Sequence, residues 1–195
     1  SVGMVSGLYM PRWLLEGDAV CAETALSHAG RGRQADFSMG LKAQCYDKGV
    51  YSYSKAYFGS YKDYVPNYYE MGYFLLANSR KYYGPSLEAD IIDRSARHPF
   101  SLRPVNHAIR ERTEMSKREW YTSVFERQAN EWKLAHDREI QTSYDTIAKA
   151  KNVYTNYVNG IKISDSLYFA ERNGLNTISQ LVRIRNGKER VVANT

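Results

Sequence analysis

The chain has 195 residues, of which 43% are hydrophobic and 17 are tyrosine, so its composition is that of a folded protein and excludes a disordered one. Its formal net charge is +6, which is compatible with an anionic partner. The basic residues are nevertheless spread along the chain and mixed with acidic ones. This pattern favours a solvated basic surface over a nucleic-acid-binding patch. No stretch is long and apolar enough to span a membrane.

The first predicted helix begins at Pro11, because proline suits the first position of a helix. Gly30 marks its predicted end, since glycine often closes a helix in the left-handed conformation. Arg31 and Arg33 would then complement the negative end of this helix. Cys21 lies in an apolar stretch of the same helix and is expected to be a small core residue rather than a metal ligand.

Five further helices are predicted before the composition changes. Ser116 starts the longest of them, with Glu119 at the capping-box position. The other four are expected over residues 37–46, 67–83, 86–96 and 105–113. Residues 50–66 are interpreted as a connection whose tyrosines pack within the loop, with a peptide- or sugar-binding cleft as the alternative. Cys45 and Cys21 belong to no zinc-ligand pattern, and a disulfide between them is left open.

The pattern changes from helical to β near residue 142. Short apolar runs follow at residues 161–163, 167–170, 178–184 and 190–192, and Asn-Gly pairs at 159–160, 173–174 and 186–187 separate them as hairpin turns would. We therefore predict a mainly α chain, with a helical domain over residues 1–142 and a β-meander over residues 143–195. So small a meander is expected to lack a core of its own and to associate with a second copy of the chain, giving a homodimer.

Glu16 is the candidate site residue in the first helix. Its carboxylate lies beside apolar residues such as Val20 and needs a cation or a hydrogen-bond donor. Gly17 follows it at a cost of about 1 kcal/mol relative to alanine, so we expect another segment to approach closely there. Glu23 repeats the acid two turns later. The residues alone favour an ion pair between Glu16 and Arg12, one turn earlier in the helix.

Residues 13–23 follow the pattern W-x-x-E-G-x-A-x-x-x-E and resemble the helix that carries the third zinc ligand of gluzincin metallopeptidases, such as the aminopeptidase N-like and thermolysin-like enzymes. The resemblance implies a zincin-like helical subdomain in which Glu16 is the metal ligand. It also implies that Tyr69 stabilises the tetrahedral intermediate. Tyr69 opens a Y-x-x-G segment similar to the Y-x-K-G motif of the aminopeptidase N-like enzymes, with Met71 in place of the lysine.

The resemblance offers further roles for three charged residues near the end of the first helix. Glu23 could support the metal ligand, although a structural salt bridge is the favoured interpretation. Arg31 and Arg33 could bind a substrate carboxylate, although a helix cap is favoured for both. These three residues complete the set of candidate site residues.

The chain departs from the gluzincin pattern because it contains no HExxH motif, and its four histidines, at positions 28, 98, 107 and 136, are not spaced as helical zinc ligands. We therefore expect this chain to bind no zinc by itself and to be inactive. In the parent protein that the resemblance implies, the HExxH half would precede Ser1 and would bring the zinc.

The wider resemblance is to large proteins of Bacteroidetes-type bacteria that join a gluzincin-like domain to a TolB- or WD40-like β-propeller. It implies a periplasmic, outer-membrane-associated or secreted protein whose partners are the HExxH half, the propeller and a peptide or protein substrate. The alternative function is a non-catalytic, peptidase-like scaffold that presents the propeller.

Overall fold

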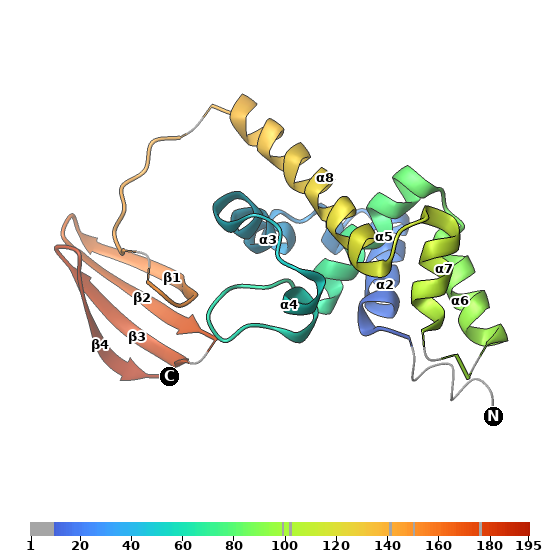
Figure 1. Cartoon of the computed structure of the whole chain (residues 1–195). Helices are drawn as coiled ribbons and strands as arrows, with labels where there is room; N and C mark the ends of the chain where they lie inside the picture. Colours follow the sequence, from blue (N-terminus) through green and yellow to red (C-terminus); the bar gives the residue numbers. More distant parts are fainter. Residues whose placement is uncertain (1–9, 99, 102, 141, 150, 176) are drawn as a thin grey trace. The chain divides into compact units, whose positions relative to one another are not determined.

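The structure is a computed structural model that describes residues 10–98, 100–101, 103–140, 142–149, 151–175 and 177–195, and these form two compact units (Figure 1). The helical unit comprises the described residues up to Gly59 together with Val65–Glu139, and the β unit comprises Ser60–Tyr64 and Ile140–Thr195. The prediction of helices followed by a C-terminal β-meander is confirmed, and the description of the chain as mainly α is corrected to a mixed fold. The sequence also did not indicate that the segment Ser60–Tyr64 belongs with the strands.

The described part of the helical unit contains seven α-helices and one 3₁₀ turn. They are α2 (Arg12–Leu26), η1 (Arg31–Arg33), α3 (Ala35–Lys48), α4 (Tyr53–Phe58), α5 (Tyr68–Tyr83), α6 (Leu87–Arg97), α7 (Pro104–Thr113) and α8 (Lys117–Arg138). Among the helices in these described residues, none combines the length and the apolar character that a membrane span needs.

Two capping boxes fix the starts of the long helices α5 and α8. The predicted box of Ser116 and Glu119 is confirmed, and Asn67 and Glu70 form a second one at α5. The end predicted for the first helix is wrong, because α2 stops at Leu26 and residues 31–33 form η1 instead of a glycine cap.

Helix α4 corrects the interpretation of residues 50–66 as a connection. Ser52 caps this short helix by accepting a hydrogen bond from the backbone N–H of Lys55. Tyr53 and Ala56 lie on one face of α4 and are buried. These residues therefore contribute to the core of the helical unit rather than to a surface loop.

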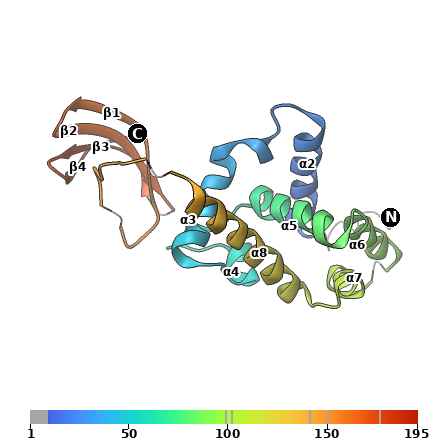
Figure 2. The same cartoon turned by 90° about the horizontal axis from the view of Figure 1, so that it is seen from above.

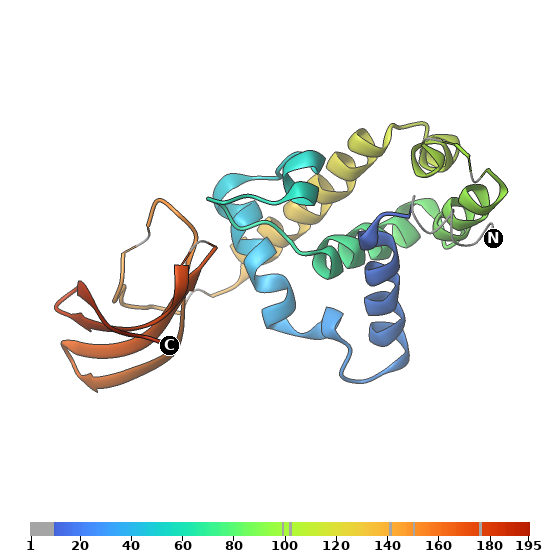
Figure 3. The same ribbon diagram turned by 90° about the horizontal axis from the view of Figure 1, so that it is seen from below.

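The core of the helical unit lies where α2, α5 and α8 meet. Trp13 and Trp120 are both fully buried, with ring centroids 5.8 Å apart. Met71 of α5 and Phe125 of α8 are buried with them. Figure 2 shows α8 running along the unit past α3, α4 and α5, all of which it contacts. Helices α6 and α7 pack against each other and are drawn in green in Figure 3.

The β unit is a four-stranded antiparallel meander in the order β1-β2-β3-β4. Its strands are β1 (Thr155–Ser164), β2 (Leu167–Gly174), β3 (Thr177–Arg185) and β4 (Lys188–Asn194). Ala170, Val182 and Ile184 are buried in a small cluster, against which Tyr157 and Tyr168 pack. The expectation that this segment lacks a core of its own is therefore wrong.

The Asn-Gly pairs of the β unit adopt different conformations. Asn186 and Gly187 form the predicted turn between β3 and β4, with φ values of 49° and 71° that suit a two-residue hairpin. Asn159 has a φ of 55° but lies inside β1, where the pairing with β2 shifts between Val158 and Ile161. The turn predicted at residues 159–160 is thus a bulge, because asparagine tolerates a positive φ in either setting.

Candidate functional site

The candidate site depends on how closely α2 approaches α5. A Cβ atom placed on Gly17 would lie 2.7 Å from the carbonyl oxygen of Gly72, and one placed on Gly72 would lie 2.7 Å from the Cα atom of Gly17. Ordinary contacts between such atoms need about 3.5 Å, so this crossing requires glycine on both helices. The close approach predicted at Gly17 is therefore confirmed, and Gly72 makes it. Glu16 precedes Gly17, and Tyr69 lies one turn before Gly72.

Glu16 lies half-buried on one flank of α2. Among the described residues, its carboxylate has no hydrogen-bond or ion-pair partner. The ion pair predicted with Arg12 does not form, because the Arg12 guanidinium lies over the ring of Tyr68, with Cζ 5.7 Å from the ring centroid. The carboxylate of Glu16 is therefore left without the cation that its surroundings favour.

Glu23, Arg31 and Tyr69 form a chain of contacts between α2 and α5. The Nε of Arg31 donates to Glu23 Oε2 at 2.9 Å, and the backbone N–H of Arg31 donates to Glu23 Oε1 at 3.1 Å. These hydrogen bonds lower the pKa of the Glu23 carboxyl, with the side-chain bond as the larger cause. The Cζ of Arg31 lies 4.8 Å from the centroid of the Tyr69 ring. Arg31 thereby links the end of α2 to the start of α5.

These contacts place the candidate residues along one flank of the α2–α5 pair. Glu16 and Glu23 are seven residues apart, which is two turns of helix, so their side chains leave α2 in nearly the same direction. Arg31 binds Glu23 and covers Tyr69, so Tyr69 lies on this flank too. The remaining candidate, Arg33, is exposed and donates from Nη1 to the carbonyl oxygen of Ser27 at 2.6 Å, next to the end of α2.

The opposite flank of α2 carries an ion cluster that is fully paired. Arg80 donates from Nη2 to Asp18 at 2.9 Å and to Glu88 at 2.5 Å. Burial raises the pKa of Glu88, against the opposing hydrogen bond from Arg80. Burial also raises the pKa of Cys21 and of Cys45 to about 11, and both cysteines are free. This flank therefore serves the packing of α2 on α5.

A metal at Glu16 would need ligands from beyond the described residues. Within the described ranges, no group of three or more histidine, cysteine, aspartate or glutamate side chains is arranged to hold a metal ion. Met71, which replaces the lysine of the Y-x-K-G motif, is fully buried in the core. It therefore cannot present a polar group beside Tyr69.

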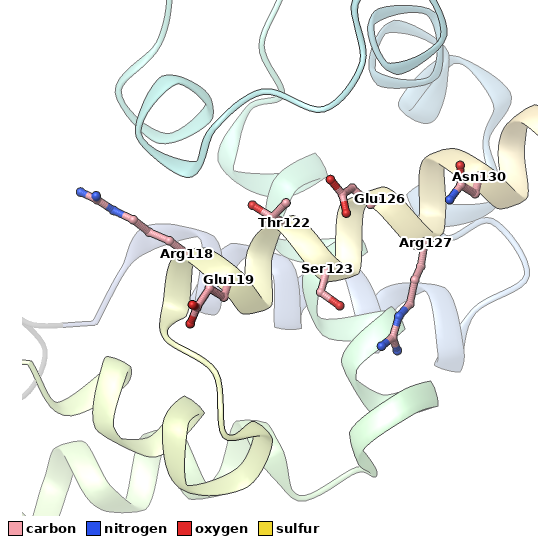
Figure 4. Close-up of a pocket in the computed structure, with 7 residues that line it drawn as sticks. All are labelled: Arg118, Glu119, Thr122, Ser123, Glu126, Arg127 and Asn130. Atoms are coloured by element: carbon pink, nitrogen blue, oxygen red, sulfur yellow. The ribbon is translucent and has the colours of Figure 1, made fainter.

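Three hollows lie elsewhere in the helical unit. The first, of about 500 Å³, is lined only by side chains of α8 that project from one polar face (Figure 4). A second, of about 930 Å³, lies between α3 and α8 and includes Tyr46, Trp132 and His136. The third, of about 730 Å³, lies between α4, α7 and α8 and includes Tyr53 and Lys117. Tyr53 and Tyr57 of this hollow belong to the segment 50–66, for which the sequence left a tyrosine-lined cleft as the alternative, whereas no signal in the sequence indicated that Arg103 and Lys117 lie beside them.

Because the first hollow has walls from a single helix, it is a solvated surface rather than an enclosed site. The candidate site at α2 and α5 is therefore defined by three features beside each other: a Glu16 carboxylate without a partner in the described part of the chain, the Tyr69 ring in contact with Arg31, and the crossing of Gly17 and Gly72. Comparison of the chain with protein-family models, with curated proteins and with solved structures gave no match.

Proposed function

We propose that this chain supplies part of the active site of a zinc peptidase of the gluzincin type. Glu16 is a zinc ligand in this proposal, and Tyr69 stabilises the tetrahedral intermediate of peptide hydrolysis. The observation that carries the proposal is the Glu16 carboxylate, which has no partner within the described ranges and lies next to the Gly17–Gly72 crossing of the two helices that bear the motifs. A peptide or protein is then the substrate.

The residues present are chemically suited to these roles. A carboxylate oxygen is an ordinary zinc ligand, and a half-buried carboxylate without a partner gains by binding a cation. When bound, zinc would activate a water molecule and polarise the scissile carbonyl. The hydroxyl group of Tyr69 would donate a hydrogen bond to the oxyanion that develops on the substrate. The guanidinium of Arg31 lies over the face of the Tyr69 ring and is held there by Glu23, so Arg31 would fix the orientation of that ring.

We propose further that the helical unit is the helical subdomain of a zincin-like fold, and that an HExxH helix from residues before Ser1 supplies the two histidines and the general base. The β unit would be a blade of a β-propeller in a protein that is secreted, periplasmic or bound to the outer membrane. Its four antiparallel strands in meander order support this proposal, since propeller blades are four-stranded sheets.

The decisive experiment is on the gene product that extends beyond Ser1. An HExxH motif shortly before Ser1 would support the peptidase, and its absence would favour the non-catalytic scaffold. In the longer product we expect Glu16→Gln to release the zinc, measured by metal analysis after dialysis. Tyr69→Phe should retain the zinc and lower kcat on a fluorogenic peptide by about 100- to 1000-fold.

Glu126→Gln is the matched control, because Glu126 is an exposed acid on α8 and lies outside the candidate site. It should change neither zinc content nor kcat. Full zinc retention by the Glu16→Gln protein would refute the role proposed for Glu16. An unchanged kcat in the Tyr69→Phe protein would refute the role proposed for Tyr69 alone.

A further inference from the structure

The hollow between α4, α7 and α8 combines aromatic and basic side chains. Its volume of about 730 Å³ is within the range of small-molecule sites. Tyr53, Tyr57 and Phe58 of α4 contribute the aromatic wall. Among the described residues that line it, three are basic and none is acidic. Charge and shape together distinguish this hollow from the open polar face of α8.

The three basic residues are Arg103, Lys117 and Arg118, and within the described residues none of them forms an ion pair. Lys117 is half-buried, and its Nζ atom lies 4.4 Å from the centroid of the Tyr53 ring. Burial, the larger cause, and the charge of Arg118, the smaller cause, both lower the pKa of Lys117. Arg118 extends outward from the first turn of α8 (Figure 4). A group of cations without a counter-charge favours the binding of an anion.

The aromatic wall is held in place at one end and exposed at the other. The hydroxyl group of Tyr53 accepts a hydrogen bond of 3.1 Å from Nε1 of the buried Trp13. Tyr57 stacks on Tyr53 with ring centroids 5.5 Å apart and an angle of 13° between the rings. Phe58 packs edge-on against Tyr57 and is 80% exposed. An exposed phenyl ring beside a fixed stack offers a surface on which a planar ring can pack.

We infer that this hollow binds a small ligand that carries an oxyanion on a planar ring. The cations bind a phosphate or a carboxylate group, and the rings of α4 bind the planar part. Arginine and lysine form short, charge-assisted hydrogen bonds with both kinds of anion. The inference is independent of the peptidase proposal, because none of the zinc or intermediate-stabilising residues lines this hollow.

Calorimetric titration of the full chain with four probes tests the inference. Phenyl phosphate combines ring and dianion, benzoate combines ring and monoanion, inorganic phosphate lacks the ring, and benzyl alcohol lacks the charge. We expect phenyl phosphate or benzoate to bind most tightly, and the order of these two identifies the anion. Equal binding of inorganic phosphate would overturn the role of the rings, and equal binding of benzyl alcohol would overturn the role of the charges.

Variants that preserve the fold separate the two parts of the site. Lys117→Met keeps an apolar side chain over Tyr53 but removes the charge. It should lower the affinity for the more tightly bound aromatic anion about tenfold. Lys133→Met removes the same charge from an exposed position of α8 outside this hollow and should leave binding unchanged. Equal weakening by both variants would show only general charge attraction and would overturn the inference.

Phe58→Ala should lower the affinity for the aromatic anion about threefold and leave the affinity for inorganic phosphate unchanged, because it removes only the contact with the ring. Phe100→Ala, which removes a ring that is 88% exposed and lies outside the hollow, is its control and should change neither affinity. An unchanged affinity for the aromatic anion in the Phe58→Ala protein would refute the proposed ring contact. Circular dichroism of each variant confirms that the helical unit is folded.

Discussion

The substitution Gly72→Ala is expected to destabilise the helical unit by about 2 kcal/mol. The new Cβ atom would lie 2.7 Å from Gly17 Cα and closer still to the carbonyl oxygen of Trp13. Both obstacles are backbone atoms of α2, so the whole helix must move away, and overpacking of this kind costs about 3 kcal/mol at the upper end of its usual range. Alanine regains about 1 kcal/mol over glycine inside a helix, which leaves a net loss of about 2 kcal/mol.

Urea unfolding followed by tryptophan fluorescence measures this loss in the helical unit alone. The chain has three tryptophans, Trp13, Trp120 and Trp132, and all of them belong to that unit. A loss of about 2 kcal/mol should lower the unfolding midpoint by about 1 M urea. Ala22→Gly, at an exposed position of α2, measures separately how much alanine stabilises a helix relative to glycine. It should lower the free energy of unfolding by about 1 kcal/mol. If Gly72→Ala unfolds at the same urea concentration as the unmodified chain or at a higher one, α2 and α5 do not approach as closely as described.

Three further predictions concern charge. Arg80→Met leaves Asp18 and Glu88 without their cation and should lower the free energy of unfolding by about 2 kcal/mol in the same assay. The control Arg97→Met, at a side chain that is 73% exposed, should lower it by less than about 0.5 kcal/mol. Equal losses would refute a special role for the cluster of Arg80, Asp18 and Glu88. In the β unit, burial raises the pKa of Glu189, but hydrogen bonds from Lys151 and Tyr157 outweigh it and lower the pKa below its ordinary value of 4.5. Its carboxylate therefore stabilises the sheet above about pH 4.5 and loses this effect as the pH falls. The amide protection factors of the described residues of β1 to β4, corrected for the intrinsic pH dependence of exchange, should fall in acid, and Glu189→Gln should reduce that pH dependence. Calorimetric titration of the chain with zinc should show no tight one-to-one binding, and such binding would contradict the need for outside ligands.

Local signals in the sequence predicted most of the helices and one hairpin turn. Ser116 and Glu119 marked the start of α8 because the capping box is a contact within four residues. Helix α4 escaped prediction because six residues are too few to show helical periodicity, and its tyrosines suit loops as well as helices. Asn159 shows the same limit, since the choice between a turn and a bulge depends on how β1 pairs with β2.

The candidate site was predicted only in part for the same reason. Gly17 indicated that a second segment approaches α2, because glycine inside a helix needs a packing reason. Nothing in its spacing identified Gly72 as that segment. The contact of Arg31 with both Glu23 and Tyr69 depends on where η1 folds back, and no local pattern encodes this position.

Helix α2 carries three carboxylates, and two of them, Asp18 and Glu16, have different surroundings although they are only two residues apart. Arg80 neutralises Asp18, and the same guanidinium also satisfies Glu88. Glu16 lacks a partner in the described structure even though Arg12 lies one turn away and the chain carries 27 lysine and arginine residues against 21 acidic ones. Cations are therefore abundant, yet the guanidinium of Arg12 is held over a tyrosine ring instead. This half-buried carboxylate, unpaired within the described residues, is available to a positive ligand from outside them, and this availability supports the metal-ligand role that we propose for Glu16.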